Sequence, residues 1–143
     1  MKKLYILMVA LFTFNMVNAQ WVTISERSYA LNSIYFPSSN IGFAVGTDSN
    51  YSGGIIKTTD GGNTWITQFP GTSWQLNSVY FTDTNTGYVV GNSGTILKTI
   101  NGGINWINQY SGADFNLHSV YFTDANTGYV VGGGIYGGVY GTV

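Results

Sequence analysis

The sequence lacks cysteine altogether and has only one histidine, one arginine and one glutamate. The absence of cysteine excludes a disulfide scaffold and every zinc site built on thiolate ligands. The single histidine, His118, has no second histidine with which to form a conventional zinc site, so we interpret it as a polar strand residue. We predict no metal and no other cofactor, and we expect packing of aromatic and β-branched side chains to stabilise the fold.

Charged residues are also scarce, at 8% of the chain, with five basic and six acidic side chains and a net charge of −1. Without residues 1–19 the chain keeps three basic and six acidic side chains, a net charge of −3. A protein that binds a phosphate backbone needs a basic patch, and this composition provides none. We therefore expect no nucleic acid partner.

The first 19 residues have the pattern of a secretory signal peptide. Lys2 and Lys3 precede an apolar run over residues 4–14, and small residues near Ala19 provide a cleavage site. The run is too short for a membrane span and no second one follows, so we predict no membrane span after cleavage. The expected location is periplasmic, cell-surface or extracellular; the alternative is an uncleaved N-terminal anchor.

The rest of the chain, residues 20–143, is dominated by one repeated unit. The segment 31–36 (LNSIYF) recurs at 76–81 and 117–122, and each copy precedes a Gly-aromatic-X-Val-Gly block. The first two copies start 45 residues apart and the next two 41 apart, and the four additional residues fall in the segment 48–53. Repetition at this period indicates one supersecondary unit that buries its apolar face against its neighbours.

The second copy predicts four short antiparallel strands. The predicted strands and turns occupy residues 76–81 (strand), 82–87 (turn), 88–90 (strand), 92–94 (hairpin), 95–99 (strand) and 101–103 (turn), with a fourth strand opening at Trp106. Four such strands in a unit of this length are typical of a β-propeller blade, whereas no segment has the apolar period of a helical repeat. We predict an all-β fold with blade repeats starting near residues 31, 76 and 117.

The repeat register predicts an incomplete ring, with two full blades and parts of others. Trp21 aligns with Trp65 and Trp106, so the chain would enter the repeat at a fourth strand, and residues 141–143 align with the start of a third strand. Unpaired edges and blade faces would then be exposed. We consider two interpretations: the N-terminal part of a longer secreted propeller, or a short protein that completes its ring by self-association.

A second motif lies between the third and fourth strands and follows the pattern Ser/Thr-X-Asp-X-Gly-X-Thr-Trp. Asp or Asn can accept backbone N–H bonds within such a turn, Gly allows a positive φ, and Trp packs below the hairpin. The motif resembles the Asp-box of neuraminidase-type (BNR) repeats, and its second copy has Asn101 and Asn105 where the pattern has Asp and Thr. The expected structural residues are Thr58, Asp60, Gly62, Thr64, Trp65, Thr99, Asn101, Gly103 and Trp106.

Together with residues 94–99 (GTILKT) and the repeated Val-Tyr-Phe and Gly-Tyr-Val-Val-Gly segments, this motif resembles the photosystem II assembly/stability-factor-like family of Asp-box propellers. The resemblance extends over residues 21–143 and implies the propeller fold. It does not by itself imply a photosynthetic role, because related repeats occur in secreted bacterial proteins.

Enzymatic interpretations find little support in the residues. Resemblance to sialidases would imply an arginine triad and a Tyr–Glu pair, but the chain has only Arg27 and Glu26. Asp83 and Asp124 occupy equivalent turn positions in consecutive repeats, so a turn role explains both, as it does for Asp60. We expect no catalytic residue.

Two lysines recur at one strand position of the repeat. Lys57 and Lys98 are expected to project from their blades, where they would be free to contact a partner.

The sequence therefore predicts a secreted, non-catalytic β-propeller repeat module for macromolecular interaction or assembly, with a protein or glycan as partner. Two alternatives remain open. One is the N-terminal fragment of a secreted, sialidase-like glycoside hydrolase, and the other is a photosystem II assembly-factor-like protein.

Overall fold

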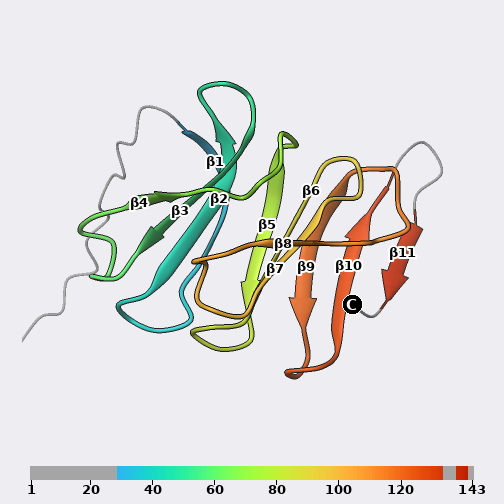
Figure 1. Cartoon of the computed structure of the whole chain (residues 1–143). Helices are drawn as coiled ribbons and strands as arrows, with labels where there is room; N and C mark the ends of the chain where they lie inside the picture. Colours follow the sequence, from blue (N-terminus) through green and yellow to red (C-terminus); the bar gives the residue numbers. More distant parts are fainter. Residues whose placement is uncertain (1–28, 134–137, 142–143) are drawn as a thin grey trace, which may run out of the picture.

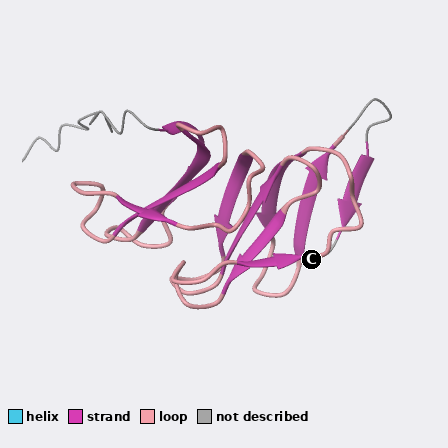
Figure 2. Ribbon diagram, turned by 45° about the horizontal axis from the view of Figure 1, so that its top comes forward, coloured by secondary structure: helices cyan, strands magenta, loops and turns pink. Residues whose placement is uncertain are grey.

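The computed structural model describes residues 29–133 and 138–141, and all regular structure in these residues is β-strand (Figure 2). In this part of the chain, no helix has the length and hydropathy needed to cross a membrane. The predicted signal peptide and the residues Trp21, Glu26 and Arg27 lie outside the described residues.

The strands form three antiparallel sheets that follow one another along the chain, which are three blades of a β-propeller (Figure 1). The first blade contains β1 (Tyr29–Tyr35), β2 (Gly42–Asp48), β3 (Gly53–Thr58) and β4 (Ile66–Gln68). The second contains β5 (Leu76–Phe81), β6 (Gly87–Gly91), β7 (Ile96–Thr99) and β8 (Ile107–Gln109). The third contains β9 (Leu117–Phe122), β10 (Gly128–Gly132) and β11 (Gly138–Gly141). The described residues do not close a ring.

The strand predictions for the second blade are confirmed to within one residue at each end. The prediction for the third blade is wrong at β11, which the repeat alignment placed from Gly141 onward. In the structure β11 includes Gly138 to Gly141, and Val139 pairs with Val131 of β10. The alignment left too many residues between the two strands, since residues 133–137 separate β10 from β11, only one residue more than the 92–95 that separate β6 from β7.

Each inner strand carries one β-bulge at the same repeat position. The pairing of β1 with β2 skips from Leu31 to Ser33, and the pairing of β5 with β6 skips from Leu76 to Ser78. The pairing of β9 with β10 likewise leaves out His118. A bulge leaves its extra residue unpaired and redirects its side chain. The side chains of the bulge residues Asn32 and Asn77 each donate a hydrogen bond to the next blade.

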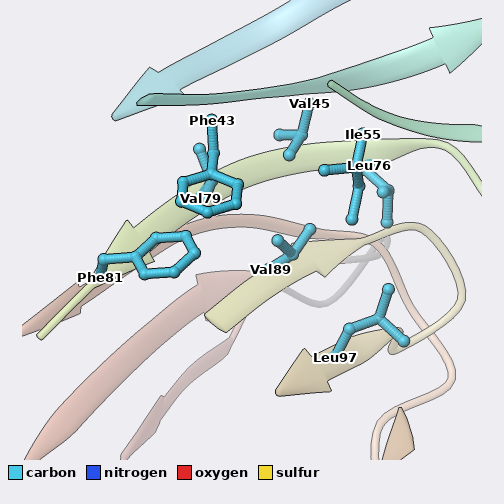
Figure 3. Packing of buried hydrophobic residues seen from close by; sticks show 8 residues of the cluster. All are labelled: Phe43, Val45, Ile55, Leu76, Val79, Phe81, Val89 and Leu97. Carbon is cyan, nitrogen blue, oxygen red and sulfur yellow. The ribbon is translucent and has the colours of Figure 1, made fainter. Parts of the chain in front are cut away.

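The hydrophobic core lies between blades rather than within one sheet. Between the first two blades, the rings of Phe43 and Phe81 stack with centroids 4.1 Å apart (Figure 3). The buried side chains that surround them are Val45, Ile55, Leu76, Val79, Val89 and Leu97. A second cluster of the same kind joins the second blade to the third. Each blade therefore depends on its neighbours to bury its apolar faces, as expected for a repeat architecture.

Glycines of the Gly-aromatic-X-Val-Gly block make the close approach of the strands possible. A Cβ atom at Gly87 would lie 2.5 Å from the ring of Phe81, and the equivalent glycines of the other blades face the same ring position. A Cβ at Gly91 would lie 2.2 Å from the carbonyl oxygen of Gln75. The repeated glycines are therefore explained by packing and not by backbone φ.

Candidate functional site

The first Asp-box motif forms a turn in which the acidic side chain is fully engaged. Asp60 Oδ1 accepts hydrogen bonds from the hydroxyl of Thr58 at 2.8 Å and from the backbone N–H of Thr64 at 2.9 Å. Its Oδ2 accepts one from the hydroxyl of Thr64 at 2.7 Å. The backbone N–H of Gly62 donates to Thr58 Oγ1, and Trp65 Nε1 donates to the carbonyl of Gly62. The carboxylate therefore holds its own turn together.

The second turn keeps this arrangement with an amide in place of the carboxylate. Asn101 Oδ1 accepts from the hydroxyl of Thr99 and from the backbone N–H of Asn105, each at 3.0 Å. The backbone N–H of Gly103 donates to Thr99 Oγ1 at 2.9 Å. Trp106 differs from Trp65, because its ring packs edge-on against the core and its buried Nε1 has no hydrogen-bond partner among the described residues. Nothing in the structure explains that unpaired group.

The hydrogen bonds to Asp60 lower the pKa of its carboxyl to about 2, chiefly through the backbone N–H and hydroxyl of Thr64. A carboxyl with a depressed folded-state pKa adds stability above its unfolded pKa, near 4, and loses it as the pH falls toward the folded value. We expect Asp60→Asn to fold, since Asn101 occupies this position in the second blade. The loss of stability of the variant between about pH 4 and pH 2 should be smaller than that of the wild type in urea unfolding at stepped pH.

The matched control for this comparison is Asn101→Asp, which places a carboxylate in the second turn. It should increase the acid sensitivity of the protein in the same pH window. Identical acid profiles for the wild type and Asp60→Asn would show that the hydrogen bonds to this carboxylate do not stabilise the folded state.

The other two aspartates considered in the sequence analysis lie in turns between the first and second strands of consecutive blades. Asp83 Oδ1 accepts the backbone N–H groups of Asn85 and Thr86, and Asp124 Oδ1 accepts those of Asn126 and Thr127. These bonds lower the pKa of both carboxyls. A general acid needs the opposite shift. Within the described part of the chain, no three His, Asp or Glu side chains gather in a group that could hold a metal ion.

The two repeated lysines lie over aromatic rings, Lys57 over Phe43 and Lys98 over Tyr88. The Nζ of Lys57 also donates a hydrogen bond of 2.7 Å to the carbonyl of Gly102 in the second blade. The expectation that Lys57 projects from its blade is therefore wrong, because the neighbouring blade offers an acceptor that the sequence of one repeat does not reveal.

Two equivalent clefts lie at the ends of the blades that are opposite the Asp-box turns. Both lie where the hairpin between the second and third strands of a blade meets the segment that leaves its fourth strand. The first cleft has a volume of about 460 Å³ and the second about 380 Å³. The first is lined by residues that include Asp48, Gly53, Thr67, Gln68, Phe69 and Thr72. The second is lined by residues that include Trp74, Gly94, Asn108, Gln109, Tyr110 and Ala113.

The clefts share a chemical character as well as a position. Each has a half-buried glutamine, Gln68 or Gln109, followed by an aromatic residue, Phe69 or Tyr110, that is more than 90% exposed. Trp74, which is half exposed, connects the two clefts, since its carbonyl lies against Gly53 of the first and the residue lines the second. The result is a row of exposed rings and amides with almost no charge.

Sequence reasoning missed these clefts. Their signal is present in the aligned repeats, where Gln-aromatic recurs at 68–69 and 109–110, with the glutamine as the last residue of the fourth strand and the aromatic residue just after it. Exposure of those rings depends on how the connecting segments lie across the blades, which the spacing does not reveal.

Comparison with known families decides the relationship of the chain. The family model for the photosynthesis system II assembly factor YCF48 matches residues 14–106, about two thirds of the sequence. The chain belongs to this family. The resemblance inferred from the repeat motifs is thereby confirmed.

Solved structures of YCF48 proteins share the fold. A YCF48 structure bound to a D1 peptide has 21% sequence identity and a TM-score of 0.66, over 80% of this chain and 37% of that chain. YCF48 from Cyanidioschyzon merolae has 18% identity and a TM-score of 0.63, over 78% of this chain and 37% of the other. The chain thus spans well under half the length of these YCF48 chains. No curated protein matches the sequence.

Proposed function

We propose that the chain is a non-catalytic protein-binding module of the photosystem II assembly-factor type. Membership of the YCF48 family supports this assembly role over the sialidase-like hydrolase fragment, and a YCF48 neighbour was solved with a D1 peptide. The aspartates Asp60, Asp83 and Asp124 support a role without catalysis, because each is occupied by hydrogen bonds within its own turn. Export through residues 1–19 remains part of the proposal.

The observation that carries the proposal is the recurrence of the same cleft in two neighbouring blades. An extended peptide presents alternating side chains and backbone groups at regular spacing, and a row of equivalent sites on a rigid scaffold matches that regularity. The Nε2 groups of Gln68 and Gln109 donate to carbonyls of their own strands, and their Oε1 atoms can accept backbone N–H groups of such a peptide. Phe69, Trp74 and Tyr110 offer flat apolar surface.

The low charge of the row defines the kind of segment it accepts. The one carboxylate that lines the first cleft, Asp48, already accepts the backbone N–H groups of Asn50 and Ser52 in its own hairpin. We therefore infer that recognition rests on apolar and aromatic side chains of the client and on its backbone, with little dependence on salt.

Fluorescence anisotropy with a labelled D1 peptide, followed by selection from a displayed library of unstructured peptides, tests the proposal. Peptides should bind the chain, and Tyr110→Ala and Trp74→Ala should each weaken binding at least about tenfold, because exposed rings of this kind are typical binding hot spots. Tyr51→Ala is the matched control, since Tyr51 is 87% exposed but lines neither cleft, and it should leave affinity unchanged.

Each outcome is informative. Binding of the D1 peptide supports the photosystem II role, and binding of library peptides alone supports a client of another kind. If no peptide binds, or the chain is instead retained on insoluble polysaccharide through Tyr110, the protein-binding proposal is overturned.

A further inference from the structure

One blade face at the start of the described chain is uncovered. The side chains of Leu31, Ile34 and Phe36 are 36%, 52% and 40% exposed. At the same repeat positions in the following blades, the side chains are at most 5% exposed, because the preceding blade covers them. Those covered residues are Leu76, Val79, Phe81, Leu117, Val120 and Phe122.

A second blade face, on β9 and β10, is likewise not covered by any described blade. Tyr121, Tyr129 and Val131 are 59%, 45% and 40% exposed. The residues equivalent to Tyr129 and Val131 in the first two blades are at most 5% exposed, since the next blade packs on them. They are Phe43, Val45, Tyr88 and Val90.

The contacts between neighbouring blades within the chain show which blade face packs on which. Phe43 and Val45 of one blade pack on the Leu-X-X-Val-X-Phe face of the next, and Tyr88 and Val90 repeat this arrangement one blade later. The uncovered face of β1 is a Leu-X-X-Val-X-Phe type of face, with Ile34 in place of Val. The uncovered face of β9 and β10 corresponds to the face that carries Phe43 and Val45 in the first blade. We propose that the two faces bind each other between two copies of this chain, head to tail, as an additional blade interface.

Polar groups also form hydrogen bonds across the contacts between neighbouring blades. Asn32 and Asn77 each donate a side-chain hydrogen bond of 2.8 Å to a carbonyl of the next inner strand, that of Leu76 or Leu117. Ser33 and Ser78 accept the backbone N–H groups of Val79 and Val120 at 3.3 Å.

In the third blade, His118 and Ser119 occupy the Asn and Ser positions, and both are exposed. An imidazole N–H can donate where the amide does. In the proposed complex His118 donates to the carbonyl of Leu31 of the second copy, and Ser119 accepts the N–H of its Ile34.

Electrostatics do not oppose this contact, because β1, β9 and β10 contain no Asp, Glu, Lys or Arg. The two faces differ from each other, so the contact is heterologous, and repeated copies form a closed ring or an open chain. This association is independent of the peptide-binding clefts, so either proposal can fail without the other.

Sedimentation velocity of the full chain over a range of concentrations tests the contact. The wild type should form oligomers larger than a dimer as the concentration rises. Ile34→Lys and Val131→Lys should each weaken association at least about tenfold, because each would place an unpaired charge in an apolar interface. Mixing the two variants should restore one 1:1 complex, since each retains the face that the other has lost.

The matched control is Ile66→Lys in β4. Ile66 is 62% exposed, and its equivalent Ile107 in the second blade is 59% exposed, so this position is not part of a blade interface. The control should associate as the wild type does, and circular dichroism should show the same β content in all variants. A wild type that stays monomeric, a lysine variant that still associates normally, or a mixture that forms no 1:1 complex would each overturn the proposal.

Discussion

Replacing Phe81 by alanine should lower the free energy of unfolding by about 3–5 kcal/mol, the range typical of large core truncations. The ring of Phe81 is 2% exposed and stacks on Phe43, with Trp106 edge-on at 6.0 Å. Removing it leaves a cavity in the contact between the first two blades, where the surrounding rings have few ways to collapse. Urea unfolding followed by tryptophan fluorescence measures the loss.

The matched control is Phe36→Ala, which removes the same side chain at the same repeat position. Phe36 is 40% exposed and makes an edge contact with Trp65, without a covering blade. Its cost should be clearly smaller at low protein concentration. If both variants lose the same stability, contact between blades does not contribute to the burial energy of this position.

The blade strands could be predicted because their determinants are local. The segment 76–81 and the Gly-Tyr-Val-Val-Gly block predict β5 and β6 directly, and the polar turn between them has the residues that bond their own backbone. The position of β11 could not be predicted from the match of residues 141–143 to residues 94–96, because short glycine-containing segments resemble one another and the pairing with β10 decides the register.

The candidate site differs even more between contacts local in the sequence, which could be predicted, and contacts between distant segments, which could not. All partners of Asp60 in its turn lie within four residues of it, so the motif alone predicts their arrangement. Trp74 and Tyr110 line one cleft although 36 positions separate them in the sequence. Their proximity results from stacking one blade on the next, which repeat spacing implies only in outline.

A methyl group at Gly87 should destabilise the protein by about 1–3 kcal/mol, the usual cost of overpacking a core. A Cβ there would lie 2.5 Å from the ring of Phe81, which cannot move because Phe43 and Trp106 enclose it. The clash should therefore outweigh the stabilisation of about 0.5–1 kcal/mol that alanine normally gives over glycine in a strand. Urea unfolding of Gly87→Ala beside the wild type gives the difference.

Gly42→Ala is the control that separates this clash from a general effect of alanine. Its Cβ would meet the ring of Phe36 at the same 2.5 Å, but Phe36 is partly exposed and can turn toward solvent, so the cost should be smaller. In the double variant Phe36→Ala/Gly42→Ala the two costs should be less than additive, because the ring that the methyl group meets is gone. Equal costs at Gly42 and Gly87, or strict additivity in the double variant, would show that ring contact is not the reason for these glycines.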